Sequence, residues 1–149
     1  MHGLMLFFHL SGLAIWLGSL IAATIMLALT KKQPELAGSA FLIRRTVRVF
    51  NMLTHPSAFI VLLTGVLMIL TRDYGDGGFW LNYMQNVGGV IVLLSIIVLS
   101  ILSGKLVNKK ALAEGEEVRV QGEKLGTFIT VALITIILVL SVILVVSYR

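Results

Sequence analysis

The sequence predicts an all-α membrane protein with four transmembrane helices. Hydrophobic residues make up 58% of the 149 residues and charged residues only 13%, and the mean hydropathy is +1.00. A soluble domain carries about 25% charged residues, and one of about 150 residues still exposes about 30% of its chain surface. The composition therefore excludes a soluble domain, including a nucleic-acid-binding one, despite a net charge of +5. The absence of cysteine excludes disulfides, thiol catalysis and cysteine-bound metals.

Four stretches contain no Asp, Glu, Lys or Arg, namely 3–30, 49–71, 77–104 and 125–148. Each exceeds the roughly 20 residues that cross a hydrocarbon core as a helix, and the alternation typical of a membrane barrel is absent. We expect a single domain over 1–149 with helices at about 4–30, 46–71, 79–108 and 124–148. The first stretch is not expected to be a cleaved signal peptide, because no basic residue precedes it and it is too long.

The basic residues predict the orientation. The first and third loops carry ten of the twelve Lys and Arg residues, whereas the second loop carries only Arg72 and the C-terminus adds Arg149. Loops one and three are therefore expected in the cytoplasm, and both termini outside the cell membrane. Short loops predict an up-down antiparallel bundle. The charged third loop is expected to extend the third helix past the membrane.

Small and weakly polar residues are expected to face neighbouring helices, because lipid provides no hydrophobic drive for helix association. In the first helix, the 3/4 spacing places on one face His9, Gly12, Trp16, Ser19 and Ala23. In the second helix, one face holds His55, Ala58, Leu62 and Gly65, and beside it lie Thr54, Ser57, Val61, Thr64 and Met68. These positions are interpreted first as packing faces.

The ionisable side chains within the predicted spans are His9 and His55. The lack of deep Asp, Glu, Lys or Arg argues against a pump. Intramembrane histidines serve as metal or haem ligands or transfer protons; the alternative is a histidine bonded to a serine or a backbone carbonyl. Centring each span in the bilayer places His9 about 12 Å outward and His55 about 7 Å inward. The two side chains are therefore not expected to share one haem.

Several thioethers are expected near His9. Depth places Met68 and residues 84–86 at its level, and Met5 lies one helical turn above it. His with Met is an axial pair for haem iron, and the same donors suit copper(I). Methionine is also a common filler of apolar interiors, so the pattern alone leaves this choice open.

Three motifs follow one another along the chain. The first span reads His9-Leu-Ser-Gly-Leu-Ala-Ile-Trp16-Leu-Gly18, the second Arg45-x-x-Arg48 with Met52-x-x-x-Pro56 and Gly65, and the third Phe79-Trp80-Leu81-Asn82-Tyr83-Met84. This order resembles the group of membrane proteins that includes the protoporphyrinogen oxidase HemJ and CopD, over nearly the whole chain. The resemblance implies haem b with His9 as a ligand. The family pattern Trp-x-His-x-Lys falls on residues 80–84, where Asn82 and Met84 replace the histidine and the lysine. A thioether accepts no proton, so porphyrinogen oxidation is not implied.

The leading hypothesis is a small integral membrane protein that binds haem b or a related redox group. His9 would be the proximal ligand and Met84 its partner, while Trp16 packs on the ring and Arg72 pairs a propionate. The chief alternative is a copper-handling protein whose outer site contains Met5, His9, Met68 and Met84. A third hypothesis is a non-catalytic helper subunit that docks a larger membrane complex. Beyond the lipid bilayer, the expected partner of the protein is a second copy of the chain or a larger membrane complex.

Overall fold

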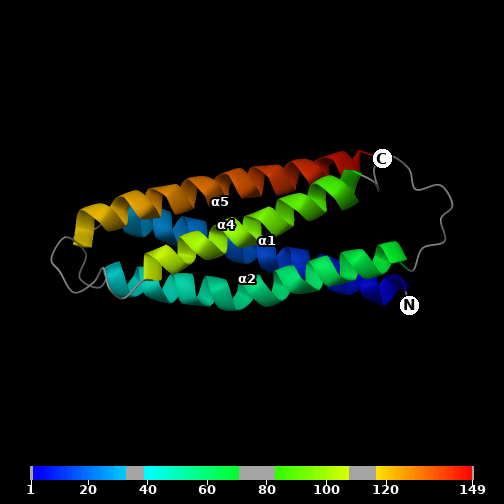
Figure 1. Cartoon of the computed structure of the whole chain (residues 1–149), viewed down its shortest axis with the longest axis horizontal. Helices are drawn as coiled ribbons and strands as arrows, with labels where there is room; N and C mark the ends of the chain where they lie inside the picture. Colours follow the sequence, from blue (N-terminus) through cyan, green and yellow to red (C-terminus); the bar gives the residue numbers. More distant parts are fainter. Residues whose placement is uncertain (1, 33–38, 71–82, 108–116, 149) are drawn as a thin grey trace.

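The structure is a computed structural model that describes residues 2–32, 39–70, 83–107 and 117–148. Four long helices fill these ranges: α1 (His2–Lys32), α2 (Ser39–Leu70), α4 (Gly89–Val107) and α5 (Glu117–Ser147). A short π-helix, η1 (Met84–Gly88), leads directly into α4 (Figure 1). No strand occurs in the described residues. The predicted all-α class is confirmed.

Each long helix supplies a segment long and apolar enough to cross a membrane. The segments are Gly3–Lys32, Phe41–Leu70, Asn86–Leu106 and Lys124–Ser147. The protein is therefore a multi-pass membrane protein, as the uncharged stretches predict. Outside the helix clusters, large apolar side chains such as Met52 (76% exposed) and Phe59 (64% exposed) face outward. Lipid solvates such side chains as well as a protein interior does.

Two helices begin earlier than expected. Helix α2 starts at Ser39, so Arg44, Arg45 and Arg48 belong to a helix rather than to a loop. Helix α5 starts at Glu117, whereas the charged extension was expected on the third helix; α4 is described up to Val107, and residues 108–116 lie outside the described part. Lys, Arg and Glu are good helix formers, so a formed span readily propagates into polar sequence.

The helices form a ring in the order α1, α2, α4, α5, with the main contacts between ring neighbours. Consecutive long helices run in opposite directions, which confirms the up-down topology (Figure 1). The start of α1 and the end of α5 lie at the same end of the bundle, together with the end of α2 and η1. We call the half of the bundle next to this end the outer half and the other the inner half.

The buried apolar residues form two clusters. The inner cluster contains Leu20, Ala23, Leu27, Ile43, Val47, Phe50, Leu99, Leu106, Leu125, Phe128 and Ala132. Within it, the rings of Phe50 and Phe128 meet edge to face with centroids 5.7 Å apart. The outer cluster takes one buried residue from each long helix, Trp16, Ala58, Val92 and Val139. The clusters hold the bundle together along its length and position His9 just beyond the outer one.

Candidate metal centre in the outer half of the bundle

His9 lies on α1 two helical turns outward of Trp16, on the face that the sequence predicts. Its side chain is buried, with 8% of its surface exposed. It contacts α2, the neighbour that follows in the chain. The imidazole is therefore enclosed by protein rather than by lipid.

Two oxygens of α2 hold the Nδ1 atom of His9. The carbonyl oxygen of Val61 lies 3.1 Å from Nδ1, and Oγ1 of Thr64 lies at 3.1 Å. A carbonyl oxygen only accepts, so Nδ1 carries the proton and donates it. The Thr64 hydroxyl donates to the carbonyl oxygen of Ile60 at 2.6 Å, which leaves its lone pairs for His9.

This bonding fixes the tautomer. With the proton on Nδ1, the Nε2 atom carries the lone pair of the neutral imidazole. Metal-ligating histidines are oriented in the same way, by a bond from the other ring nitrogen to a backbone carbonyl. Both of these hydrogen bonds use Nδ1 rather than Nε2. The arrangement can therefore present Nε2 to an electrophile such as a metal ion.

Two glycines allow α1 and α2 to approach at this point. A Cβ atom on Gly12 would lie 3.0 Å from Cγ2 of Val61 and 3.1 Å from the carbonyl oxygen of Ser57. A Cβ on Gly65 would lie 3.5 Å from Cε1 of His9. Small residues at such crossings let the helix backbones come close. Both glycines lie on the interhelical face, as expected.

The register of α1 and α2 places two methionines near His9. Ser19 of α1 bonds Thr54 of α2, with the hydroxyl oxygens 3.2 Å apart. Ser19 lies ten residues inward of His9, and Thr54 lies ten residues inward of Thr64, so the two antiparallel helices keep the same register at both contacts. Counting one turn outward from His9 and from Thr64 leads to Met5 and Met68, which are both half-buried. The bilayer estimate put Met68 level with His9, but Thr64 and Gly65 occupy that level and Met68 lies one turn further out.

Trp16 lies inside the outer cluster and is fully buried. Its ring packs among apolar residues of the bundle core. Its indole Nε1 is buried and has no hydrogen-bond partner among the described residues. Met84 begins η1, but its side chain lies outside the described part of the structure, and so does Arg72.

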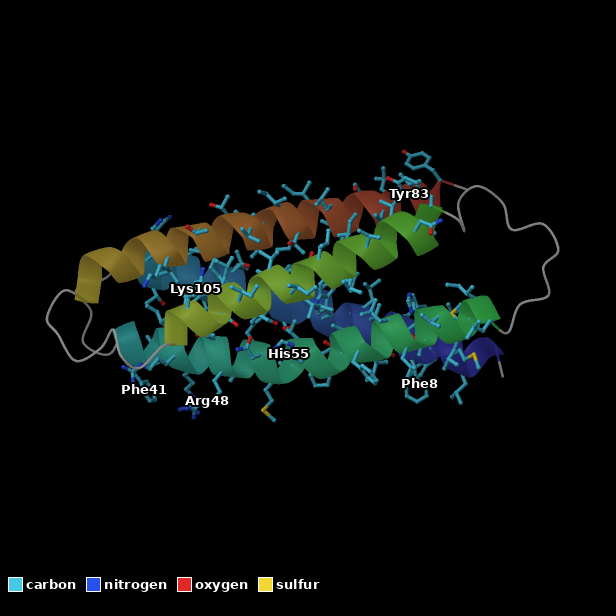
Figure 2. The ribbon with its side chains drawn as sticks, viewed as in Figure 1. Phe8, Phe41, Arg48, His55, Tyr83 and Lys105 are labelled. Carbon is cyan, nitrogen blue, oxygen red and sulfur yellow. The ribbon has the colours of Figure 1, made fainter. Side chains whose placement is uncertain are left out.

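His55 lies midway along α2 (Figure 2), and its side chain is exposed. The sequence pattern placed it on the inward face, and this was wrong. The buried residues around it are Thr54, Ser57 and Ala58, because only small side chains fit where α1 approaches the backbone of Ser57. The register puts His55 nine residues inward of Thr64, or about 13 Å from the level of His9. This is less than the 19 Å expected from bilayer depths, but still too far for one shared site.

The sequence did not reveal which atoms bind His9. Thr64 was assigned only to a flank of the inward face, and the carbonyl of Val61 has no sequence signature. Within the described ranges, no group of three or more His, Cys, Asp or Glu residues could hold a metal ion. No family model, curated protein or solved structure matches this chain. The candidate centre therefore depends on His9 and the thioethers around it.

Proposed function

We propose that this membrane protein binds copper(I) in its outer half, through Nε2 of His9 and the thioethers of Met5 and Met68. The supporting observation is the pair of hydrogen bonds at Nδ1, because they leave the Nε2 lone pair as the donor. The α1–α2 register brings both methionines to the neighbouring turn on the same side of the pair. The protein would hold copper(I) near the outer surface of the membrane.

The donor chemistry favours a soft ion. Imidazole and thioether ligands suit copper(I), whereas carboxylates and water suit magnesium, calcium and manganese. His9 and the two methionines supply one nitrogen and two sulfurs without a carboxylate or thiolate. Copper(I) carries a single positive charge, so a neutral ligand set leaves only that charge to be accommodated within the membrane. The site therefore fits copper(I) better than zinc, which takes four ligands and prefers thiolate or several histidines.

Haem b is the second candidate, and a different observation favours it. An axial histidine needs the same Nδ1 anchor that His9 has, and the buried Nε1 of Trp16 could donate to an acceptor on a cofactor. Haem would supply one-electron redox chemistry. The other residues expected to hold it, Met84 and Arg72, have side chains outside the described part of the structure.

Purified protein distinguishes these candidates. Copper(I) titration under reducing conditions, in competition with a chromogenic chelator, should give one ion per chain. His9→Ala should weaken binding at least 100-fold, and the double variant Met5→Leu/Met68→Leu at least tenfold. His55→Ala is the matched control and should bind normally. A Soret band in the natural protein that disappears in His9→Ala would support haem, rather than copper, as the bound group. A folded protein that binds neither copper nor haem would contradict both candidates and favour the helper-subunit hypothesis.

We also infer that a second copy of the chain covers the lipid-facing side of α2. His55 is exposed there, close to the midpoint of its span, and a lipid-facing polar residue at this depth is costly. In a dimer with a two-fold axis along the membrane normal, equal residues meet at equal depth. A neutral imidazole both donates and accepts, so one His55 can bond the other.

Crosslinking tests this dimer, because the natural chain has no cysteine. Met52 is 76% exposed and lies three residues before His55 on the same face. Met52→Cys should form a disulfide-linked dimer in oxidised membranes, and adding His55→Leu should abolish it. Ile97→Cys, on the lipid-facing side of α4 at similar depth, should remain monomeric. Equal crosslinking with and without His55 would exclude the pairing.

A further inference from the structure

Hydroxyl side chains separate the outer cluster from the inner cluster. We call one such residue from each long helix, taken together, the hydroxyl layer: Ser19, Thr54, Ser95 and Thr135. Along each helix the hydroxyl falls between an outer and an inner cluster residue, in the orders Trp16–Ser19–Leu20, Ala58–Thr54–Phe50, Val92–Ser95–Leu99 and Val139–Thr135–Ala132. Hydroxyl groups thus lie between the two apolar clusters on all four long helices.

Contacts between helices support this common level. The hydroxyl oxygens of Ser19 and Thr54 lie 3.2 Å apart, joining α1 to α2. On the other side of the bundle, a Cβ atom on Gly88 would lie 3.4 Å from Cγ1 of Val142. Ser95 and Thr135 each lie seven residues, about two turns, inward of this contact on antiparallel helices. They are therefore level with each other.

The hydroxyl layer lies at the centre of the membrane. Each of its four residues falls within two residues of the midpoint of its membrane-spanning segment. Thr54, Ser95 and Thr135 are buried, with 2%, 7% and 4% of their surfaces exposed. A polar group buried in an apolar setting is costly unless it is hydrogen-bonded. The polar groups at this level therefore require hydrogen-bonding partners.

Two buried polar atoms flank the hydroxyl layer without a partner among the described residues: Nε1 of Trp16 and Oδ1 of Asn51. Trp16, fully buried, lies three residues outward of Ser19, and Asn51 lies three residues inward of Thr54. The first atom can only donate and the second only accepts. By the α1–α2 register their residues are about 9 Å apart along the bundle, far beyond a hydrogen bond of about 3 Å.

We propose that the hydroxyl layer binds water inside the bundle, between the indole of Trp16 and the amide of Asn51. Water both donates and accepts, so separate water molecules can bond the orphan donor on one side of the layer and the orphan acceptor on the other. Buried water typically makes about three hydrogen bonds, and the hydroxyl oxygens of Ser95 and Thr135 can accept further bonds from it. The ligand is neutral, because no Asp, Glu, Lys or Arg lies within five residues of any member of the layer to balance a charge.

This water site is separate from the proposed copper site. Ser19 follows His9 by ten residues, which is about 15 Å along α1, and the outer cluster lies between them. Loss of copper binding in His9→Ala therefore gives no information on the hydroxyl layer. The two proposals can fail independently.

Nuclear magnetic resonance of the indole proton tests the site. The chain has two tryptophans, so Trp80→Phe leaves Trp16 as the single indole. In micelles of deuterated detergent, its Nε1 proton should show a cross-peak to water. Thr135→Val keeps the side-chain shape and should reduce this cross-peak at least threefold. Thr130→Val on the same helix removes an exposed hydroxyl and should leave it unchanged.

Two results would overturn the proposal. One is a folded Trp80→Phe protein, with the helical circular dichroism of the natural chain, whose indole shows no water cross-peak. The other is a cross-peak that keeps its full intensity in both Thr135→Val and Ser95→Ala. Ser95→Ala is the second variant because it tests the same layer from α4 if Thr135→Val does not fold.

Discussion

The Nδ1 atom of His9 lies 3.1 Å from the carbonyl oxygen of Val61, so a side chain of the first helix bonds the backbone of the second. Thr64 shares this proton through its hydroxyl oxygen at 3.1 Å. The bond joins the two helices within the membrane and sets the direction in which Nε2 presents its lone pair. The His9 side chain thus joins two helices through Nδ1 and offers Nε2 as a potential ligand atom.

Thr64→Val should weaken copper(I) binding about tenfold, because partners behind a metal-ligating histidine typically contribute 10- to 100-fold in affinity. The carbonyl of Val61 remains, so the loss should stay near the lower limit. Chelator competition measures it. Thr30→Val is the control, since its hydroxyl bonds Met26 at 2.8 Å in the same manner but far from His9. Equal copper(I) affinities of the two variants would show that Thr64 does not contribute to the site.

Gly12→Ala should lower the free energy of unfolding by about 1–3 kcal/mol, as overpacking does in other cores. The new Cβ would meet Val61 and the backbone oxygen of Ser57 at 3.0 and 3.1 Å. Gly18→Ala on the same helix has nothing within 4 Å and should be neutral or more stable by up to about 1 kcal/mol, through helix propensity. Unfolding followed by circular dichroism compares them. A loss of the same size at both positions would contradict close packing at Gly12.

Both chain termini should face outside the cell. Figure 2 shows Arg48 and Lys105 toward the end of the bundle opposite to Phe8 and Tyr83, so the basic residues of α2 and α4 lie on the side expected in the cytoplasm. A phosphatase reporter that is active only outside should work after Arg149 and fail when inserted within residues 108–116. The reverse pattern would invert the orientation and place His9 in the cytoplasmic half.

The four spans and their helical form could be predicted from the sequence, because they depend on local composition. Uncharged stretches of more than 20 residues cross the membrane only as helices when barrel alternation is absent. The inward position of His9, Gly12 and Trp16 was also predictable, since Gly12 is the small residue around which α1 packs. The helix ends were less predictable, because α2 and α5 extend through charged residues beyond their apolar stretches.

The rotation of α2, the partner of His9 and the position of Met68 were decided only by tertiary structure. In lipid both faces of a helix are apolar, so hydropathy does not distinguish the stripe through Thr54 and Ser57 from the adjacent one through His55. The choice depends on which stripe allows the backbones to meet at Gly12. A backbone carbonyl such as that of Val61 has no sequence signature, because every residue has one, and only the packed register selects it.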